Sequence, residues 1–215
     1  MKTFVKFTGL TSVEAVAAVP GGGAAGFVVQ VPGSARNLPL DAVPPLIDGL
    51  TKDAEAWAVT VDPSAELIHR LFDETGVDRI QVYGKIPADL EFLEIHHIVP
   101  SLTLPPAGTT GPEPAIPPAE DYSRLHLDAA GDPLASGSST RGDWEMASRI
   151  VEGQPGRKVI LAGGIGPDTL AEVLSSVRPW GLDVALGPGA GNSAEDARRI
   201  REFLAAVEQF EKDHP

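Results

Sequence analysis

The sequence predicts an α/β protein whose residues 1–215 form one domain, a single (β/α)₈ barrel. Eight short apolar runs alternate with stretches that carry helix start signals. Most of these runs are continuously apolar, which is typical of parallel strands buried on both faces. A chain of 215 residues lies at the lower end of the size range of this architecture. Repeated strand–helix–strand units with right-handed crossovers favour closure into a barrel at this number of strands.

Each predicted element has its own local signal. The predicted strands are Phe4–Thr8, Gly26–Val31, Ala56–Val61, Arg79–Tyr83, His97–Leu102, Arg124–Asp128, Val159–Ala162 and Leu182–Ala185. Helices are predicted after capping or proline-containing starts: Val13–Val19 after Ser12, Ala65–Glu74 after Pro63–Ser64, Thr169–Val177 after Pro167–Asp168, and a long final helix over Ser193–Glu211.

One connection departs from the alternation. Six prolines lie between Pro105 and Pro118, in the link between the fifth and sixth predicted strands. Proline at this density does not support a helix interior, because it lacks the backbone N–H and clashes with the preceding turn. The fifth helix is therefore expected to be missing or replaced by an irregular segment. We interpret this segment as a spacer loop, with a lid over the site as the alternative.

The composition excludes several functions. The net charge of −13, from 30 acidic and 17 basic residues, repels nucleic acid and anionic lipid. Cysteine is absent, which rules out disulfides, thiolate metal sites and cysteine catalysis. No signal sequence or membrane span is apparent, so a cytoplasmic protein is expected. His96 and His97 are adjacent but have no third ligand at suitable spacing, so no metal is expected.

Two glycine-rich segments predict a phosphate site. LAGGIGPDTL, residues 161–170, places Gly163 and Gly164 after the seventh strand, and DVALGPGAGN, residues 183–192, places Gly187 after the eighth. Glycines let backbone N–H groups approach an anion closely. Barrels frequently bind phosphate with the loops after strands seven and eight, so a small phosphorylated metabolite is the expected ligand.

Charged residues near strand ends are the candidate chemical groups. Asp128 closes the sixth strand, Asp183 lies in the last strand, Arg36 follows the second and Asp62 ends the third. Barrel chemistry occurs at the carboxyl ends of the strands, so these side chains are placed near the mouth. A helix cap or a surface ion pair is the alternative reading of each, most evenly balanced for Asp62.

Alternation along a strand groups further side chains. Lys6 and Thr8 are two residues apart on the first strand and point to the same side, as do His126 and Asp128 on the sixth.

Taken together, the segments resemble those of the phosphoribosylanthranilate isomerase family over nearly the whole chain. The matching segments are VKFTGLTSVEAV, GFVVQVPGSARNLP, DRIQVYG, LDAAGDPLASGSSTRGDW, LAGGIGPDTL and the strand around Asp183. The combination is specific to the family, although no single segment is.

The resemblance implies a function without a cofactor. The family converts N-(5-phosphoribosyl)anthranilate to its 1-deoxyribulose 5-phosphate form, an Amadori rearrangement in the tryptophan pathway. An acid protonates the furanose oxygen, and a base then removes the proton from C2 of the sugar. By resemblance, Asp128 is the acid, Arg36 binds the anthranilate carboxylate, and Gly163, Gly164 and Gly187 hold the phosphate.

The chain departs from the family at three places. Thr8 stands where the family has its cysteine base, Tyr83 replaces a histidine, and Ala185–Leu186 replace a serine pair. A threonine hydroxyl is not a competent base by itself near neutral pH, whereas a thiol can be tuned to be one. A tyrosine hydroxyl can still donate a hydrogen bond, so Tyr83 is expected to bind substrate together with Lys6.

Three explanations account for a threonine at the position of the family's cysteine base. Asp183 could take over as the base; Thr8 could orient a water or the substrate at a reduced rate; or the activity is lost. The alternatives to the isomerase are accordingly another phosphosugar isomerase, epimerase or lyase, or a degenerate barrel that binds a phosphorylated metabolite. Nothing in the sequence predicts the oligomeric state.

Overall fold

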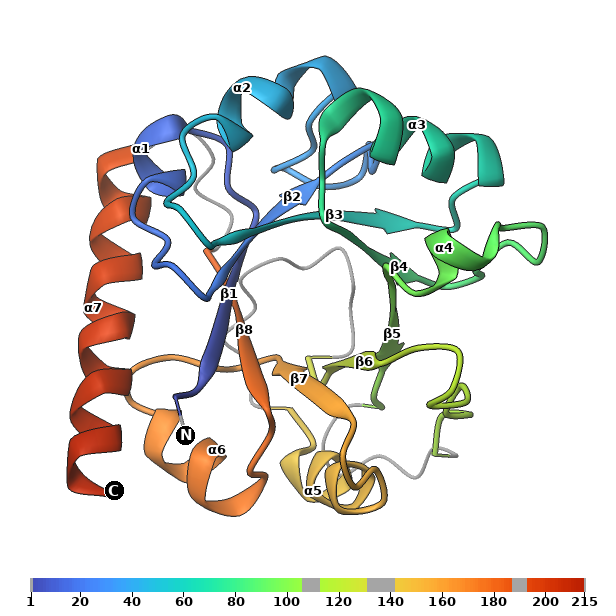
Figure 1. Ribbon diagram of the computed structural model, residues 1–215. Coiled ribbons are helices and arrows are strands. Elements are labelled where there is room, and N and C mark those ends of the chain that lie inside the picture. The colour runs from blue at the N-terminus through green and yellow to red at the C-terminus, as the bar shows by residue number, and fades with distance from the viewer. Residues whose placement is uncertain (1, 106–112, 131–141, 187–192, 215) are drawn as a thin grey trace.

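The protein forms a closed barrel of eight parallel strands surrounded by helices (Figure 1). The computed structural model describes residues 2–105, 113–130, 142–186 and 193–214. Each strand pairs with the next, and β1 pairs with β8 to close the ring. The strands are β1 Phe4–Thr8, β2 Ala24–Val28, β3 Glu55–Val61, β4 Arg79–Tyr83, β5 Ile98–Thr103, β6 Arg124–Asp128, β7 Lys158–Ala162 and β8 Gly181–Ala185. The predicted fold class is therefore confirmed.

The helices lie outside the strands, with the long last helix beside the seam of β1 and β8 in Figure 1. The helical elements are α1 Val13–Val16, the 3₁₀ helix Leu40–Ala42, α2 Pro44–Ile47, α3 Ala65–Thr75, α4 Phe92–Ile95, α5 Trp144–Glu152, α6 Leu170–Ser176 and α7 Ser193–Asp213. Ser12 and Ser64 cap α1 and α3 through their hydroxyl groups, as their sequence positions indicated.

Most predicted elements differ from the structure by one or two residues at an end, but two of them end three residues earlier than predicted. The second strand was predicted over Gly26–Val31, but β2 begins at Ala24 and ends at Val28. Gln30 has a left-handed φ of 56°, which an extended strand cannot accommodate. The first helix ends at Val16 instead of Val19. Before Pro20, the backbone hydrogen bonds join residues three positions apart, as in a turn, instead of four.

Between β5 and β6, residues 113–123 of the described chain contain no helix. The prediction that the proline-rich link lacks a regular fifth helix therefore holds for the part that the structure describes. The rest of that link, residues 106–112, lies outside the described residues. Whether the segment acts as a lid stays a prediction.

The amino-terminal end of the barrel is filled by side chains. Phe4, Trp57 and Trp180 pack there, and the Arg124 guanidinium lies between 5.2 and 5.4 Å from the three ring centroids. Both terminal nitrogens of Arg124 donate to the Glu55 carboxylate at 2.7 Å. This packed end leaves the polar interior of the barrel at the carboxyl ends of the strands, where barrel active sites lie.

Candidate active site

A buried cluster of polar side chains joins β1 to β8. Lys6 and Asp183 are register partners across the closing seam, and Lys6 Nζ donates to Asp183 Oδ2 at 2.7 Å. The Thr8 hydroxyl donates to Asp183 Oδ1 at 2.7 Å and accepts a hydrogen bond from Lys6 Nζ. Lys6 is inaccessible to solvent, whereas Thr8 and Asp183 are 9% and 5% exposed. The structure therefore brings together three residues that the sequence placed on two separate strands.

Two further residues, to which the sequence alone assigned no role, belong to this cluster. His126 Nε2 donates to Asp183 Oδ2 at 3.0 Å, because a carboxylate can only accept. The other ring nitrogen, Nδ1, lies 2.6 Å from the Ser101 hydroxyl. His126 was recognised as facing the same side as Asp128, and that alternation was the available signal. Nothing in the local sequence marked Ser101.

The charges in this cluster are strongly coupled. Burial alone would raise the pKa of Asp183, but the Lys6 ammonium and the hydrogen bonds from His126 and Lys6 hold it well below its usual range. Burial lowers the pKa of Lys6, and attraction to Asp183 and Asp128 offsets this only in part. Asp183 is thus a carboxylate with little affinity for a proton, next to an amine that loses its proton more readily than an exposed lysine.

Asp128 ends β6 and is held by one donor on each oxygen. The Tyr83 hydroxyl donates to Oδ2 at 3.0 Å, and the backbone N–H of Ala130 donates to Oδ1 at 2.9 Å. Burial and the nearby carboxylates raise the pKa of the Tyr83 hydroxyl well above its ordinary value, so Tyr83 remains a donor. The structure thus brings Tyr83, at the family's histidine position, into contact with the predicted acid.

Arg36 is buried and engaged by a carboxylate that the sequence analysis did not identify. The guanidinium is 1% exposed and bonds both oxygens of Asp196, at 2.6 Å from Nη1 and 3.2 Å from Nη2. It also donates to the carbonyl oxygens of Gly9 and Leu186. Asp196 lies in the first turn of α7, 160 residues along the chain, so no local pattern linked the two. Arg36 therefore joins the ends of β1 and β8 to α7.

The loop after β7 has the backbone conformation that its glycines allow. Gly163 and Gly164 have φ values of 98° and 68°, in the left-handed region that glycine favours. A Cβ at Gly163 would lie 2.4 Å from the Ala130 nitrogen. The Thr169 hydroxyl closes the loop by donating to the Gly164 carbonyl at 2.9 Å and by accepting from Gly166 N–H. Gly187, the third predicted phosphate contact, lies outside the described residues.

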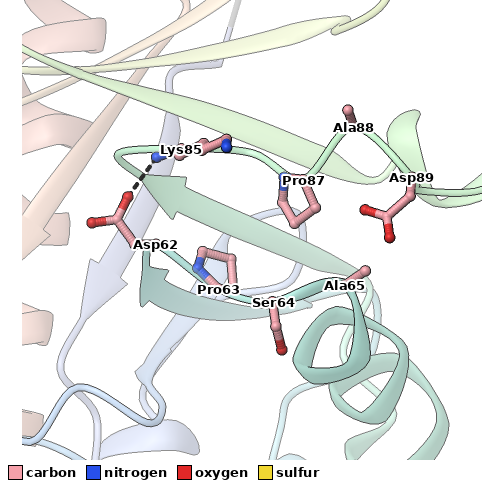
Figure 2. Close-up of a pocket in the computed structure, with 8 residues that line it drawn as sticks. All are labelled: Asp62, Pro63, Ser64, Ala65, Lys85, Pro87, Ala88 and Asp89. Carbon is pink, nitrogen blue, oxygen red and sulfur yellow. Dashed lines mark hydrogen bonds between the residues drawn. The ribbon is translucent and has the colours of Figure 1, made fainter.

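Asp62 lies apart from this cluster, on the rim of a pocket of about 680 Å³ between the loops after β3 and β4 (Figure 2). Its Oδ1 accepts the backbone N–H of Lys85 at 2.7 Å. Only glycine fits at position 84, because a Cβ there would lie 2.2 Å from the same oxygen. Of the readings left open by the sequence, the structure therefore favours a structural role for Asp62, in stabilising the turn after β4.

The described residues include no group of three or more His, Cys, Asp or Glu side chains placed to hold a metal ion. Among the helices of the described segments, none is both long and apolar enough to cross a membrane.

The fold and the site together define a class. A closed (β/α)₈ barrel with buried carboxyl groups and a lysine–threonine pair at the carboxyl ends of its strands has the architecture of a barrel enzyme. The profile of one family, described as N-(5'phosphoribosyl)anthranilate (PRA) isomerase, matches residues 5–206. The chain belongs to this family.

Individual relatives support the assignment along the whole chain. The N-(5'-phosphoribosyl)anthranilate isomerase of Haloferax volcanii is 31% identical over 209 residues, which cover 95% of this chain and 93% of that protein. That of Chelativorans sp. is 30% identical over 214 residues, with 96% of each chain covered. Among solved structures, the Thermus thermophilus phosphoribosyl anthranilate isomerase superposes with a TM-score of 0.74 at 28% identity, covering 96% of this chain and 99% of that one.

Proposed function

We propose that this protein converts N-(5'-phosphoribosyl)anthranilate to 1-(o-carboxyphenylamino)-1-deoxyribulose 5-phosphate. The observation that carries this proposal is the placement of Asp128 at the end of β6, at the same end of the barrel as the Lys6–Thr8–Asp183 cluster. The reaction needs an acid that opens the furanose ring and a base that removes the C2 proton. The site offers a carboxyl group for the first step and a proton-accepting cluster for the second.

Asp128 is proposed as the acid, and Tyr83 as the residue that orients it. The hydroxyl of Tyr83 donates to one oxygen of the Asp128 carboxyl group, and the N–H of Ala130 donates to the other. A carboxyl group held in this way cannot rotate freely, so its proton can be directed toward one substrate atom, the ring oxygen.

The phosphate is proposed to bind at the loop after β7. The N–H groups of Gly163 and Gly164 donate to no other group among the described residues, and their left-handed conformations leave backbone N–H groups available to an anion. A solved phosphoribosyl anthranilate isomerase with the same fold is a complex with reduced 1-(o-carboxyphenylamino)-1-deoxyribulose 5-phosphate. The proposed ligand is therefore a small phosphorylated sugar derivative.

The expected contact of Arg36 with the anthranilate carboxylate stays a prediction. The Asp196 carboxylate already occupies two nitrogens of the guanidinium. A substrate carboxylate would have to share Arg36 with Asp196 or displace it. The structure supports a role of Arg36 in shaping the mouth more directly than a role in contacting substrate.

The test measures the loss of anthranilate fluorescence as N-(5'-phosphoribosyl)anthranilate is consumed, for the wild type and for Asp128→Asn. The amide keeps the size of the carboxyl group but cannot deliver its proton, so kcat/KM should fall by about 10²–10⁴-fold. Asp73→Asn, the same change at an exposed position of α3, is the control and should retain wild-type activity. No turnover by folded wild-type protein would refute the proposed function.

A further inference from the structure

Lys6 is a fully buried amine that points toward the position of the family's base. It lies on β1 two residues before Thr8, and its Nζ is within hydrogen-bond distance of Thr8 Oγ1 and Asp183 Oδ2. The centroid of the Trp57 ring lies 5.5 Å from the same amine. The amine therefore contacts the hydroxyl that replaces the family's cysteine.

The neighbouring strand is shaped to accommodate this contact. Gly26 of β2 is the register partner of Thr8, and a Cβ at this position would lie 2.7 Å from Thr8 Oγ1 and 3.1 Å from Lys6 Nζ. Both distances are shorter than ordinary van der Waals contacts, so any larger residue would separate the amine from the hydroxyl or displace both. The absence of a side chain at Gly26 leaves room for the lysine–threonine pair inside the barrel.

Asp183, the carboxylate considered above as a substitute base, is a poor acceptor in this setting. Its two oxygens already accept hydrogen bonds from Lys6, Thr8 and His126. These donors stabilise the ionised form, so the pKa of Asp183 lies well below its usual range.

Burial inside the barrel favours the neutral amine of Lys6 more than solvent does for an exposed lysine. The titratable groups that face it are Asp183 on β8, His126 and Asp128 on β6, and Tyr83 on β4. The two carboxylates attract the ammonium form, but burial in the barrel outweighs them and lowers the pKa of Lys6. Lysines tuned in this way by burial serve as general bases in enzymes.

We propose that Lys6 is the final acceptor of the substrate's C2 proton and that Thr8 relays it. In the structure the Thr8 hydroxyl donates to Asp183 Oδ1, so it first turns to donate to the lone pair of neutral Lys6 Nζ. The C2–H bond then breaks as Thr8 Oγ1 takes the proton, and the proton of the Thr8 hydroxyl moves to Lys6 Nζ. The electron pair of the C–H bond becomes the C1=C2 double bond, and the C1=N pair of the ring-opened iminium returns to nitrogen. The products are the enolamine and the Lys6 ammonium, and Asp183 stabilises the ammonium. This inference rests on the proposed function.

The experiment compares pH profiles and variants in the fluorescence assay. For the wild type, kcat/KM should rise with pH through a midpoint below 10.5, the ordinary value of lysine, because only the neutral amine accepts a proton. Lys6→Arg is permanently charged and Lys6→Met has no amine, so both should lose at least about 10²-fold in kcat/KM. Lys52→Arg, at an exposed position, is the control.

Adding Thr8→Cys separates proton transfer from a purely structural role of Lys6. A thiolate at position 8 takes the C2 proton directly, and a cation beside it stabilises the thiolate. The variant Thr8→Cys/Lys6→Arg should therefore recover at least about tenfold over Lys6→Arg, with a pH midpoint moved to that of the thiol.

Three results would overturn the inference. The first is a folded Lys6→Arg or Lys6→Met variant with activity within about threefold of wild type, well short of the general-base effect. The second is a folded double variant without recovery, which would mean that Lys6 positions substrate. The third is an unchanged pH profile in Lys6→Met. Circular dichroism checks folding, and wild-type protein without turnover would instead refute the proposed function, and this inference with it.

Discussion

Removal of the Asp196 carboxylate is expected to destabilise the fold strongly. Asp196 is 2% exposed and Arg36 is 1% exposed, and the two form two nitrogen–oxygen contacts. Removing one partner of a buried ion pair costs about 3–5 kcal/mol, because the remaining charge stays out of water without its counter-charge. We therefore expect Asp196→Ala to lower the free energy of unfolding by about 3–5 kcal/mol.

The measurement is urea-induced unfolding, with thermal unfolding as a second readout. For a chain of this size, each 1 kcal/mol corresponds to roughly 2–4 °C, so Tm should fall by about 6–20 °C. Asp213→Ala is the matched control, since this residue lies in the last turn of the same helix and is exposed. It should change stability by no more than about 0.5 kcal/mol.

A small effect would refute this reasoning. If Asp196→Ala and Asp213→Ala both lose less than about 1 kcal/mol, the guanidinium is sufficiently stabilised by its other contacts or becomes hydrated in the variant. Asp196→Asn refines the result, because the amide keeps one acceptor oxygen but removes the charge. It should fall between Asp196→Ala and the wild type.

Three further changes test other parts of the structure. Gly26→Ala should lower kcat/KM more than tenfold in the fluorescence assay, because the added Cβ would lie 2.7 Å from Thr8 Oγ1. The same overpacking should lower the free energy of unfolding in urea by about 1–3 kcal/mol. Gly163→Ala should raise KM and cost about 1–3 kcal/mol, because φ is 98° and its Cβ would lie 2.4 Å from a backbone nitrogen. Glu55→Gln should flatten the loss of stability in acid, measured as urea midpoints between about pH 3 and 6 around the ordinary glutamate pKa.

The sign of the Glu55 effect follows from its pKa. Burial would raise that pKa, but the hydrogen bonds and charge of Arg124 hold it below its ordinary value of 4.5. The ion pair therefore stabilises the fold fully above that ordinary value, and the contribution is lost as pH falls through the lower pKa of the folded state. Equal acid sensitivity of Glu55→Gln and wild type would contradict this.

For the glycines, Gly76→Ala is a control for φ, since this residue also has a positive φ but no neighbour within 4 Å of its Cβ.

Most of the fold prediction depended on the apolar runs that mark the strands. The bounds of β1, β4 and β6 match the predicted ranges, because each is an apolar run flanked by polar or turn residues. The error in β2 came from the apolar sequence that continues beyond Val28, where the left-handed backbone at Gln30 ends the strand. An apolar run in the sequence predicts the existence of a strand more reliably than it predicts the residue at which the strand ends.

The site was predictable only as far as local pattern reaches. Lys6 and Thr8 were placed on one face by alternation alone. Their common partner Asp183, and the pairing of Arg36 with Asp196, join residues 160 or more positions apart. Such contacts depend on barrel closure and helix docking, which a single sequence does not specify. The local signal for Arg36, a guanidinium after a strand, was compatible with an internal or an external carboxylate.

The position of the Lys6–Asp183 pair also bears on how the enzyme becomes active during synthesis. The two residues are 177 positions apart and meet at the seam between the first and last strands. A chain emerging from the ribosome carries Lys6 early but cannot supply its counter-charge until β8 has been made. Burial of Lys6 without this counter-charge is unfavourable, so we expect a nascent chain with β1 to β7 to stay open along the seam. The last strand both closes the barrel and completes the reactive cluster, so partly made chains are expected to be inactive.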